Sequence, residues 1–267
     1  MNQPGGQPRT FTRYVAIGDS FTEGMSDPDP DHANRYVGWA DRLAAHLAPM
    51  ASGDNVFGYA NLAVRGRLLD DIVGPQLENA IALEPDLVSI VGGGNDILRP
   101  KADIDSLAAR LENAVARLRT SGADVLMATP TDPRDAPLVK ATRGRAAIYT
   151  AHIWSIACRH DAHVIDLWGM GALRDWRLWA PDRIHMTSEG HRRVALNAFS
   201  TLGFTAEDVG WAIPLPAAPP ISRAAAARAN AQWAREYVGP WVRRRLRGES
   251  SGDSISAKRP RITPLEE

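Results

Sequence analysis

The sequence predicts an α/β protein built on one doubly wound parallel sheet with helices on both faces. Short apolar runs alternate with segments of helical periodicity along residues 13–203, a pattern typical of parallel strands joined by helices. The runs are apolar almost throughout, which indicates strands that are buried on both faces. Glycines and polar residues follow these runs directly, and in doubly wound sheets the working site lies where the strands end.

Length and composition allow one substantial core. The 267 residues are 44% hydrophobic and 23% charged, with 31 basic and 31 acidic side chains. This balance gives no whole-molecule charge for nucleic-acid binding, so no nucleic-acid partner is expected. A single cysteine, Cys158, excludes an intramolecular disulfide. Its apolar, helical surroundings favour a buried structural thiol over a catalytic one.

Five segments have the pattern of buried strands. The first, "RYVAIGDS", is a short apolar run that ends in glycine and polar residues. The third, "PDLVSIVGGGND", runs into a glycine-rich loop. The segments that contain the five strands are 13–20, 56–64, 85–96, 123–133 and 162–168.

Helical segments separate these strands. The clearest covers residues 103–122, where Asp103 or Asp105 can cap the start and Gly122 lies past the end. The segment 68–83 has helical spacing but contains Gly74-Pro75, which predicts a break. The other predicted helices are 35–48, 143–161 and 187–203.

The composition divides the chain into a main domain, residues 13–212, and two kinds of end. Residues 1–12 are rich in glycine, proline, glutamine and threonine and are predicted to be disordered. A Pro/Ala linker and an Arg-rich amphipathic helix are expected over 213–247, followed by a disordered tail over 248–267.

The basic helix of this C-terminal part carries aromatic residues at a spacing of four. Trp233, Tyr237 and Trp241 therefore share one face, and residues 223–267 hold ten basic and five acidic side chains. Such a face can pack against the main domain or a second subunit, which would make a homo-oligomer, or it can dock on an acidic membrane surface or a protein partner.

A serine stands directly after the first strand. The hydroxyl of Ser20 is a weak nucleophile unless a base takes its proton, most often a histidine that a carboxylate orients. His185 fits this role because Asp182 precedes it by three residues, so that the carboxylate can reach the far imidazole nitrogen. The remaining histidines lie in predicted helices, at helix ends or in a charged loop: His32, His46, His152, His160, His163 and His191.

Hydrogen-bond donors for a developing oxyanion follow the first three strands. The second strand leads to the backbone N–H of Gly66, and the third leads to the side-chain amide of Asn95. The backbone N–H of Ser20 is a third donor. Donors aimed at one oxygen are what ester or amide cleavage requires.

Together these residues resemble the SGNH branch of the GDSL esterases and lipases. The blocks "GDSFTEG", "NLAVRG", "GGGND" and "DRIH" match the four blocks of that family in order, over roughly residues 12–205. The resemblance implies a catalytic triad of Ser20, His185 and Asp182, with Ser20, Gly66 and Asn95 as the oxyanion hole. It also implies a three-layer, flavodoxin-like sheet of five parallel strands, an acyl-enzyme, and neither a metal nor an organic cofactor.

The expected function is therefore that of a serine esterase acting on small-molecule carboxylic esters with short acyl groups. The alternative is a scaffold of minor catalytic activity whose basic C-terminal helix binds a membrane surface or a protein partner. Whether Asp182 is essential stays open, because some serine hydrolases work with serine and histidine alone.

Three other enzyme classes fit less well. An α/β-hydrolase would carry G-x-S-x-G, and a dinucleotide-binding fold would carry G-x-G-x-x-G, which "GGGNDI" does not complete. A metallophosphoesterase would use Asp19, Asp96 and histidines as ligands, but the asparagine loop has no adjacent histidine. Trp168, Trp176 and Trp179 precede "DRIH" and either wall the acyl pocket or fill the core.

The sequence carries no targeting signal of the usual kinds. Residues 1–13 lack the apolar run of a signal peptide, and no stretch approaches the ~20 apolar residues of a membrane span. A cytoplasmic protein with no transmembrane segment is expected.

Overall fold

A computed structural model describes residues 9–33, 35–51, 56–136, 139–219, 222–239 and 252–265. Within this part of the chain the sheet has six strands in the order β5-β4-β3-β1-β2-β6. The five predicted strands are all parallel, and the sixth pairs antiparallel with β2 at one edge. Their bounds are β1 Arg13–Gly18, β2 Gly58–Asn61, β3 Leu87–Val91, β4 Asp124–Ala128, β5 His163–Ile165 and β6 Arg259–Pro264.

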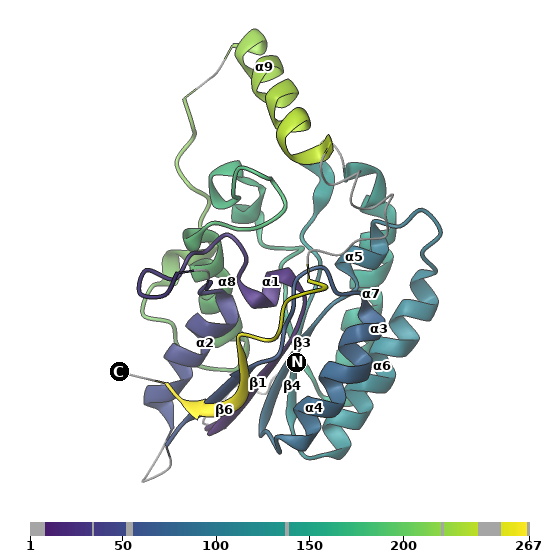
Figure 1. Cartoon of the computed structure of the whole chain (residues 1–267), viewed down its shortest axis with the longest axis vertical. Coiled ribbons are helices and arrows are strands. Elements are labelled where there is room, and N and C mark those ends of the chain that lie inside the picture. Colours follow the sequence, from purple (N-terminus) through teal and green to yellow (C-terminus); the bar gives the residue numbers. More distant parts are fainter. Residues whose placement is uncertain are drawn as a thin grey trace.

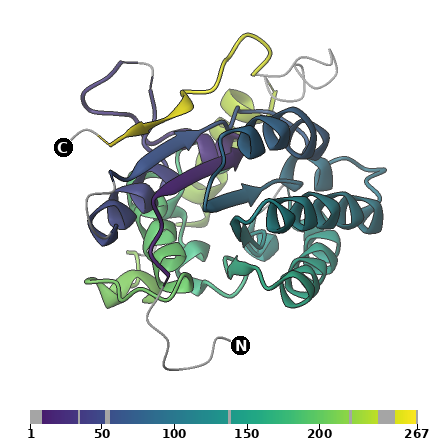
Figure 2. The same cartoon turned by 90° about the horizontal axis from the view of Figure 1, so that it is seen from below.

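Helices cover both faces of this sheet, as predicted (Figures 1 and 2). Helices α2 and α8 pack together on one face, and the layer that contains α4, α6 and α7 covers the other. The bounds are α1 Ser20–Glu23, α2 Trp39–Leu47, α3 Leu69–Asp71, α4 Leu77–Ala82, α5 Gly94–Ile97, α6 Ile104–Thr120, α7 Arg143–His160, α8 Ser188–Thr201 and α9 Arg223–Trp233.

The central strand serves both layers because successive side chains of a strand point to opposite faces. In β1, Tyr14 and Ala16 belong to the cluster under α2 and α8, whereas Val15 and Ile17 belong to the cluster on the other face. All four are completely buried. This explains why polar and apolar residues do not alternate over residues 14–18 of the strand, all of which are buried.

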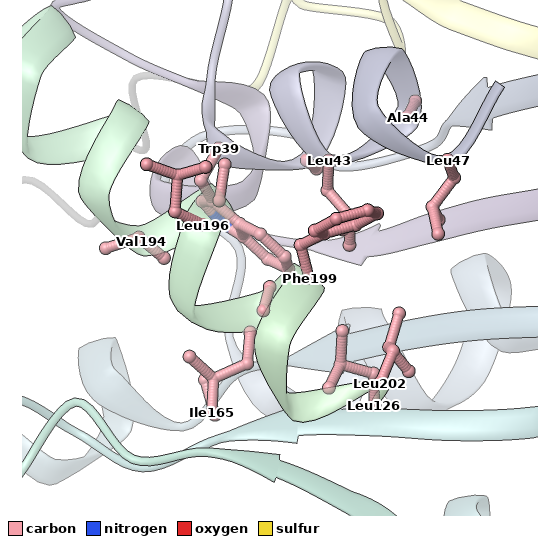
Figure 3. Packing of buried hydrophobic residues seen from close by; sticks show 14 of the residues in the cluster. Trp39, Leu43, Ala44, Leu47, Leu126, Ile165, Val194, Leu196, Phe199 and Leu202 are labelled. Atoms are coloured by element: carbon pink, nitrogen blue, oxygen red, sulfur yellow. The ribbon is translucent and has the colours of Figure 1, made fainter. Parts of the chain in front are cut away.

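Figure 3 shows how one of these layers closes on the sheet. Side chains of α2 and α8 interlock above strand residues Leu126 and Ile165. Trp39 is fully buried at the start of α2, and Phe199 is almost fully buried in α8. The other labelled residues of this cluster are Leu43, Ala44, Leu47, Val194, Leu196 and Leu202.

The helix break predicted at Gly74-Pro75 is replaced in the structure by a π-helical turn. The chain continues through a π-helical turn, Ile72–Gln76, between α3 and α4, with Pro75 inside it. Proline has no backbone N–H to donate to the helix. The wider hydrogen-bond spacing of a π-turn accommodates Pro75 without ending the helical segment.

The sheet has six strands instead of the predicted five, because the tail predicted to be disordered over 248–267 contributes strand β6 from its described residues, 252–265. Residues 248–251 and 266–267 lie outside the described part. Strand β6 pairs with β2 along the edge of the sheet (Figure 2), with Tyr59 opposite Thr263. An edge strand tolerates the two prolines of "RPRITP" because only one side must hydrogen-bond. Ile262 also fits against Gly58, where a Cβ would lie 2.3 Å from its Cγ2.

Two smaller expectations are wrong as well. Of the N-terminal residues predicted to be disordered, 1–8 lie outside the described part, but Phe11 is buried and Thr12 binds the carboxylate of Asp86 through its N–H, 2.7 Å, and its hydroxyl, 2.8 Å. Cys158 is exposed, because the buried stripe of α7 uses other positions, among them Tyr149 and Ile153.

A side chain completes the backbone pairing where β1 ends. The Gln76 amide donates to the carbonyl of Gly18, 2.9 Å, and its oxygen accepts from the Gly18 N–H, 2.8 Å. Gly18 is required here, since a Cβ would lie 2.5 Å from Thr22 Oγ1 and 2.7 Å from the Val91 carbonyl oxygen. These contacts fix the residue from which the chain turns into α1.

Asp19 forms that turn. Its carboxylate accepts the backbone N–H of Phe21, 3.1 Å, and so caps α1, whose first residue is Ser20. Burial raises the pKa of this carboxyl from 3.8 to about 6, although the Phe21 N–H and the charge of His185 act in the opposite direction. Keeping Asp19 ionised therefore lowers the stability of the folded protein.

We expect Gln76→Ala to lower the free energy of unfolding by about 1–3 kcal/mol, because it leaves the Gly18 N–H buried without this acceptor. Denaturant unfolding measures the effect. Asn79→Ala is the matched control, since Asn79 is exposed on α4, the helix that directly follows Gln76. Equal stability of the two variants would contradict the role of Gln76.

The raised pKa of Asp19 predicts a pH-dependent loss of stability. Between pH 3.8 and about 6 the folded protein holds a proton that the unfolded chain has released, so stability falls as pH rises through this window. Relative to Asp19→Asn, which cannot titrate, the wild type should lose about 2 kcal/mol of unfolding free energy between roughly pH 4.5 and 7.5. Denaturant titrations of both proteins across this range would reveal a constant difference if the carboxyl titrated normally.

Candidate active site

Ser20, His185 and Asp182 form a continuous hydrogen-bond chain at the carboxyl end of the sheet. His185 Nε2 lies 3.0 Å from Ser20 Oγ, and His185 Nδ1 lies 2.6 Å from Asp182 Oδ2. Because the ionised carboxylate can only accept, Nδ1 carries the proton, and Nε2 is free to accept the serine hydroxyl. The structure thus brings together the three residues that the sequence predicted as a triad.

The loop before α8 holds Asp182 by backbone donors as well. Asp182 Oδ1 accepts from the N–H groups of Ile184, 2.9 Å, and His185, 3.0 Å. Burial acts to raise the pKa of Asp182, but the hydrogen bonds and charge of His185 and the Ile184 N–H bring it below the ordinary value. The carboxylate is therefore ionised where it orients the imidazole.

Asn95 joins the loops that follow the first three strands. Its Nδ2 donates to the backbone oxygen of Arg67, 3.0 Å, and to Asp19 Oδ2, 3.3 Å. Arg67 adjoins Gly66, and Asp19 adjoins Ser20, so the predicted donors share one edge of the sheet. Gly66 has φ 75°, a left-handed conformation that favours glycine.

The other histidines take no part in this chain. His191 is fully buried on α8, where its Nδ1 accepts the backbone N–H of Trp39, 3.2 Å, and its ring stacks on Phe21. Burial lowers the pKa of His191 to about 4, so the ring is neutral at neutral pH. His152 and His160 are bound to the carboxylates of Asp105 and Glu112 instead.

The tryptophans near "DRIH" have mixed environments. Trp179 packs against the core beneath α2 and α8, and its indole donates to the Leu173 carbonyl, 2.7 Å. Trp176 is 38% exposed and lies beside Arg183. Its role in an acyl pocket stays a prediction, as does that of Trp168.

Two cavities of the described part lie away from the Ser20–His185–Asp182 hydrogen-bond chain. One of about 520 Å³ lies between α4, α6 and α7, and one of about 490 Å³ lies between α4 and the segment that leads into β6. Ser20 and His185 line neither of them.

Trp233 is the residue beside the triad whose contacts the sequence predicted least well. It lies on the predicted basic helix, α9, but its indole is buried and donates to the backbone oxygen of Asp182, 3.0 Å. The spacing of four between the aromatic residues indicated which face of the helix is buried, but it did not indicate that this face covers the loop of Asp182. Trp241 and the arginines of "VRRRLRG" lie outside the described residues, so contact with a membrane or second subunit stays a prediction.

Two further features concern possible partners of the chain. The described helices include none long and apolar enough to cross a bilayer. In the same residues, no group of three or more His, Cys, Asp or Glu side chains is arranged to hold a metal ion.

Solved structures with this fold include proteins from two bacteria and one from an environmental sample. An acetylxylan esterase from Geobacillus stearothermophilus is 21% identical, with a TM-score of 0.57 over 72% of this chain and 94% of its own. An α/β hydrolase from the metagenome of Lake Arreo is 22% identical, with a TM-score of 0.59 over 72% of this chain and 95% of its own. A GDSL-like lipase described as putative, from Parabacteroides merdae, is 16% identical, with a TM-score of 0.59 over 71% and 94%.

These identities establish a shared fold and leave the substrate open. No curated protein sequence matches the chain. Residues 16–193, however, match the model of the GDSL-like lipase/acylhydrolase family. This span contains every residue of the hydrogen-bond chain described above. The protein therefore belongs to the GDSL-like lipase/acylhydrolase family and is a carboxylic ester hydrolase.

Proposed function

We propose that the protein hydrolyses short-acyl carboxylic esters through an acyl-enzyme on Ser20. The observation that carries this proposal is the hydrogen-bond chain from Ser20 Oγ through the His185 ring to Asp182, with links of 3.0 and 2.6 Å. These lengths are within the reach that proton transfer needs. The sequence motifs at the same positions support it independently.

The chemistry then follows from the proton positions. Ser20 Oγ attacks the ester carbonyl while His185 Nε2 takes the hydroxyl proton, and Asp182 stabilises the charged ring that results. The tetrahedral intermediate collapses when His185 returns the proton to the leaving alcohol. Water then repeats the two steps on the acyl-enzyme, so that the acid is released and Ser20 regains its proton.

Three donors are proposed for the oxyanion: the N–H groups of Ser20 and Gly66, and the Asn95 amide. In the resting protein the longer of the two Asn95 contacts, 3.3 Å, goes to Asp19. An oxyanion that takes over this N–H leaves the shorter contact to Arg67, 3.0 Å, in place to hold the amide. An amide that Arg67 already holds in place needs little rearrangement when the charge develops.

Two observations support the choice of short acyl groups. A long acyl chain binds well only if a deep apolar cavity covers it, and Ser20 lines neither of the two cavities described above. One protein of the same fold is named an acetylxylan esterase, which acts on an acetyl ester. An acetyl group on a polar alcohol is the substrate class proposed here.

Ser20→Ala should abolish turnover of a nitrophenyl acetate, with a loss of about 10⁴-fold or more in kcat, because it removes the nucleophile. Circular dichroism and thermal unfolding check that the fold is intact. Ser155→Ala, on the surface of α7, should retain full activity. Substantial turnover by Ser20→Ala would remove the nucleophile assignment.

Asn95→Ala should lower kcat by about 10²–10³-fold, the usual effect of losing one oxyanion donor. The change in KM should be small, since the donor acts mainly on the transition state. Steady-state kinetics on the same ester measure both constants, with the exposed Asn113→Ala as the control. An unchanged kcat would exclude Asn95 from the oxyanion hole.

A further inference from the structure

The C-terminal extension, residues 213–267, contacts both sides of the candidate site. It lies beyond residues 16–193, the span that matches the family. Its helix α9 lies at the end of the molecule toward which the parallel strands run, and β6 returns along the sheet edge (Figure 1). A segment added to the family domain thus reaches the active-site loops from two directions.

The first contact is between α9 and the loop that carries Asp182 and His185. The Trp233 indole N–H donates to the Asp182 backbone oxygen, 3.0 Å. Arg183 lies between two tryptophans, with its guanidinium carbon 5.6 Å from the ring centre of Trp176 and 4.7 Å from that of Trp233. Arg183 also donates to the side-chain oxygen of Asn230, 2.7 Å.

This loop needs external support because its backbone is strained. Arg183 has φ 58°, in the left-handed region that is unfavourable for a residue with a Cβ. The turn that it makes lets the Asp182 carboxylate accept the N–H groups of Ile184 and His185. Contacts to the Asp182 carbonyl and to the Arg183 side chain hold the strained peptide from both ends.

The second contact is between Lys258 and the end of the nucleophile helix. The ammonium group donates to the backbone oxygens of Glu23, 2.6 Å, and Tyr36, 2.8 Å, and to the Asp41 carboxylate, 2.6 Å. Its three donors are therefore all used, and its side chain is only 12% exposed. Glu23 is the last residue of α1, whose first residue is Ser20.

We propose that the C-terminal extension is a positioning element of the active site, in which Trp233 fixes the Asp182–His185 loop and Lys258 fixes the helix that begins at Ser20. Together they hold the 3.0 Å approach of His185 Nε2 to Ser20 Oγ. A displacement of about 1 Å at such a contact lowers rates by roughly 100-fold. The effect on rate rests on the function proposed above.

The burial of Trp233 distinguishes this role from docking on a membrane. An interfacial helix presents its tryptophans to the headgroup region. Trp233 is only 9% exposed, and its polar atom is already bonded to the protein. It therefore serves the active-site loop in the folded chain.

Trp233→Phe in the full chain tests the first contact, because it keeps an aromatic ring beside Arg183 and removes the N–H donor. We expect kcat on nitrophenyl acetate to fall about tenfold, with KM changed less than about twofold and little change in Tm. The His185 Nδ1 proton, observed by proton NMR without substrate, should exchange with water about tenfold faster. Trp154→Phe, on the exposed face of α7, should leave all three quantities unchanged.

Lys258→Met tests the second contact, since it keeps the aliphatic stem and removes the three donors. At a temperature well below its own Tm, it should lower kcat about tenfold or more, with KM nearly unchanged. Lys101→Met, at an exposed lysine, is the control. A lower Tm with wild-type kcat would show a purely structural contact and overturn this half of the proposal.

The outcomes separate this inference from the proposed function. If Ser20→Ala is inactive while Trp233→Phe retains wild-type kcat and proton exchange, the positioning role is wrong and the esterase mechanism stands. If Ser20→Ala remains active, the mechanism is wrong. The His185 proton then still tests the hold of α9 on the loop, because faster exchange in Trp233→Phe supports that hold and unchanged exchange excludes it.

Discussion

The hydrogen bond between Ser20 Oγ and His185 Nε2 joins residues 165 positions apart in the chain. It requires the turn after β1 and the loop before α8 each to keep one conformation, because a small rotation of either breaks it. Neither segment has a long regular element of its own, and α1 has four residues. Both are held by side chains that bond to backbone groups, as in the caps made by Asp19 and Asp182.

The end of β1 is correspondingly rich in buried polar groups. Gln76 pairs with both backbone groups of Gly18. Asn61, at the end of β2, donates to the backbone oxygen of Thr22, 3.0 Å, and accepts from the Ala63 N–H, 3.1 Å. Buried amides are tolerated only when their hydrogen bonds are made, and a satisfied set then permits a single arrangement. The site is therefore held rigid by the hydrogen bonds of these side chains more than by the backbone hydrogen bonds between strands.

The sequence was informative where a pattern depends on neighbours in the chain. The five parallel strands, the positions of Ser20 and Asn95 beyond two of them, and the position of His185 before the last helix of the domain could be predicted, because the signals for them are local in the chain. Strand β6 could not, since "RPRITP" has prolines and charges and pairs through its backbone. The contacts of Trp233 and Gln76 were also missed, because each depends on a partner far away in the chain. Local patterns thus located the chemistry, while the supports of the site depend on tertiary contacts.

The buried carboxyl of Asp19, beside the candidate site, lowers the stability of the protein. Its carboxyl is buried with a pKa of about 6, so keeping it ionised at neutral pH lowers stability. A positive charge on His185 attracts the ionised carboxylate of Asp19. In the proposed mechanism His185 becomes charged only as Ser20 attacks, so this attraction acts on the transition state more than on the resting enzyme. A group that destabilises the fold is thus explained by the charge that the reaction creates beside it.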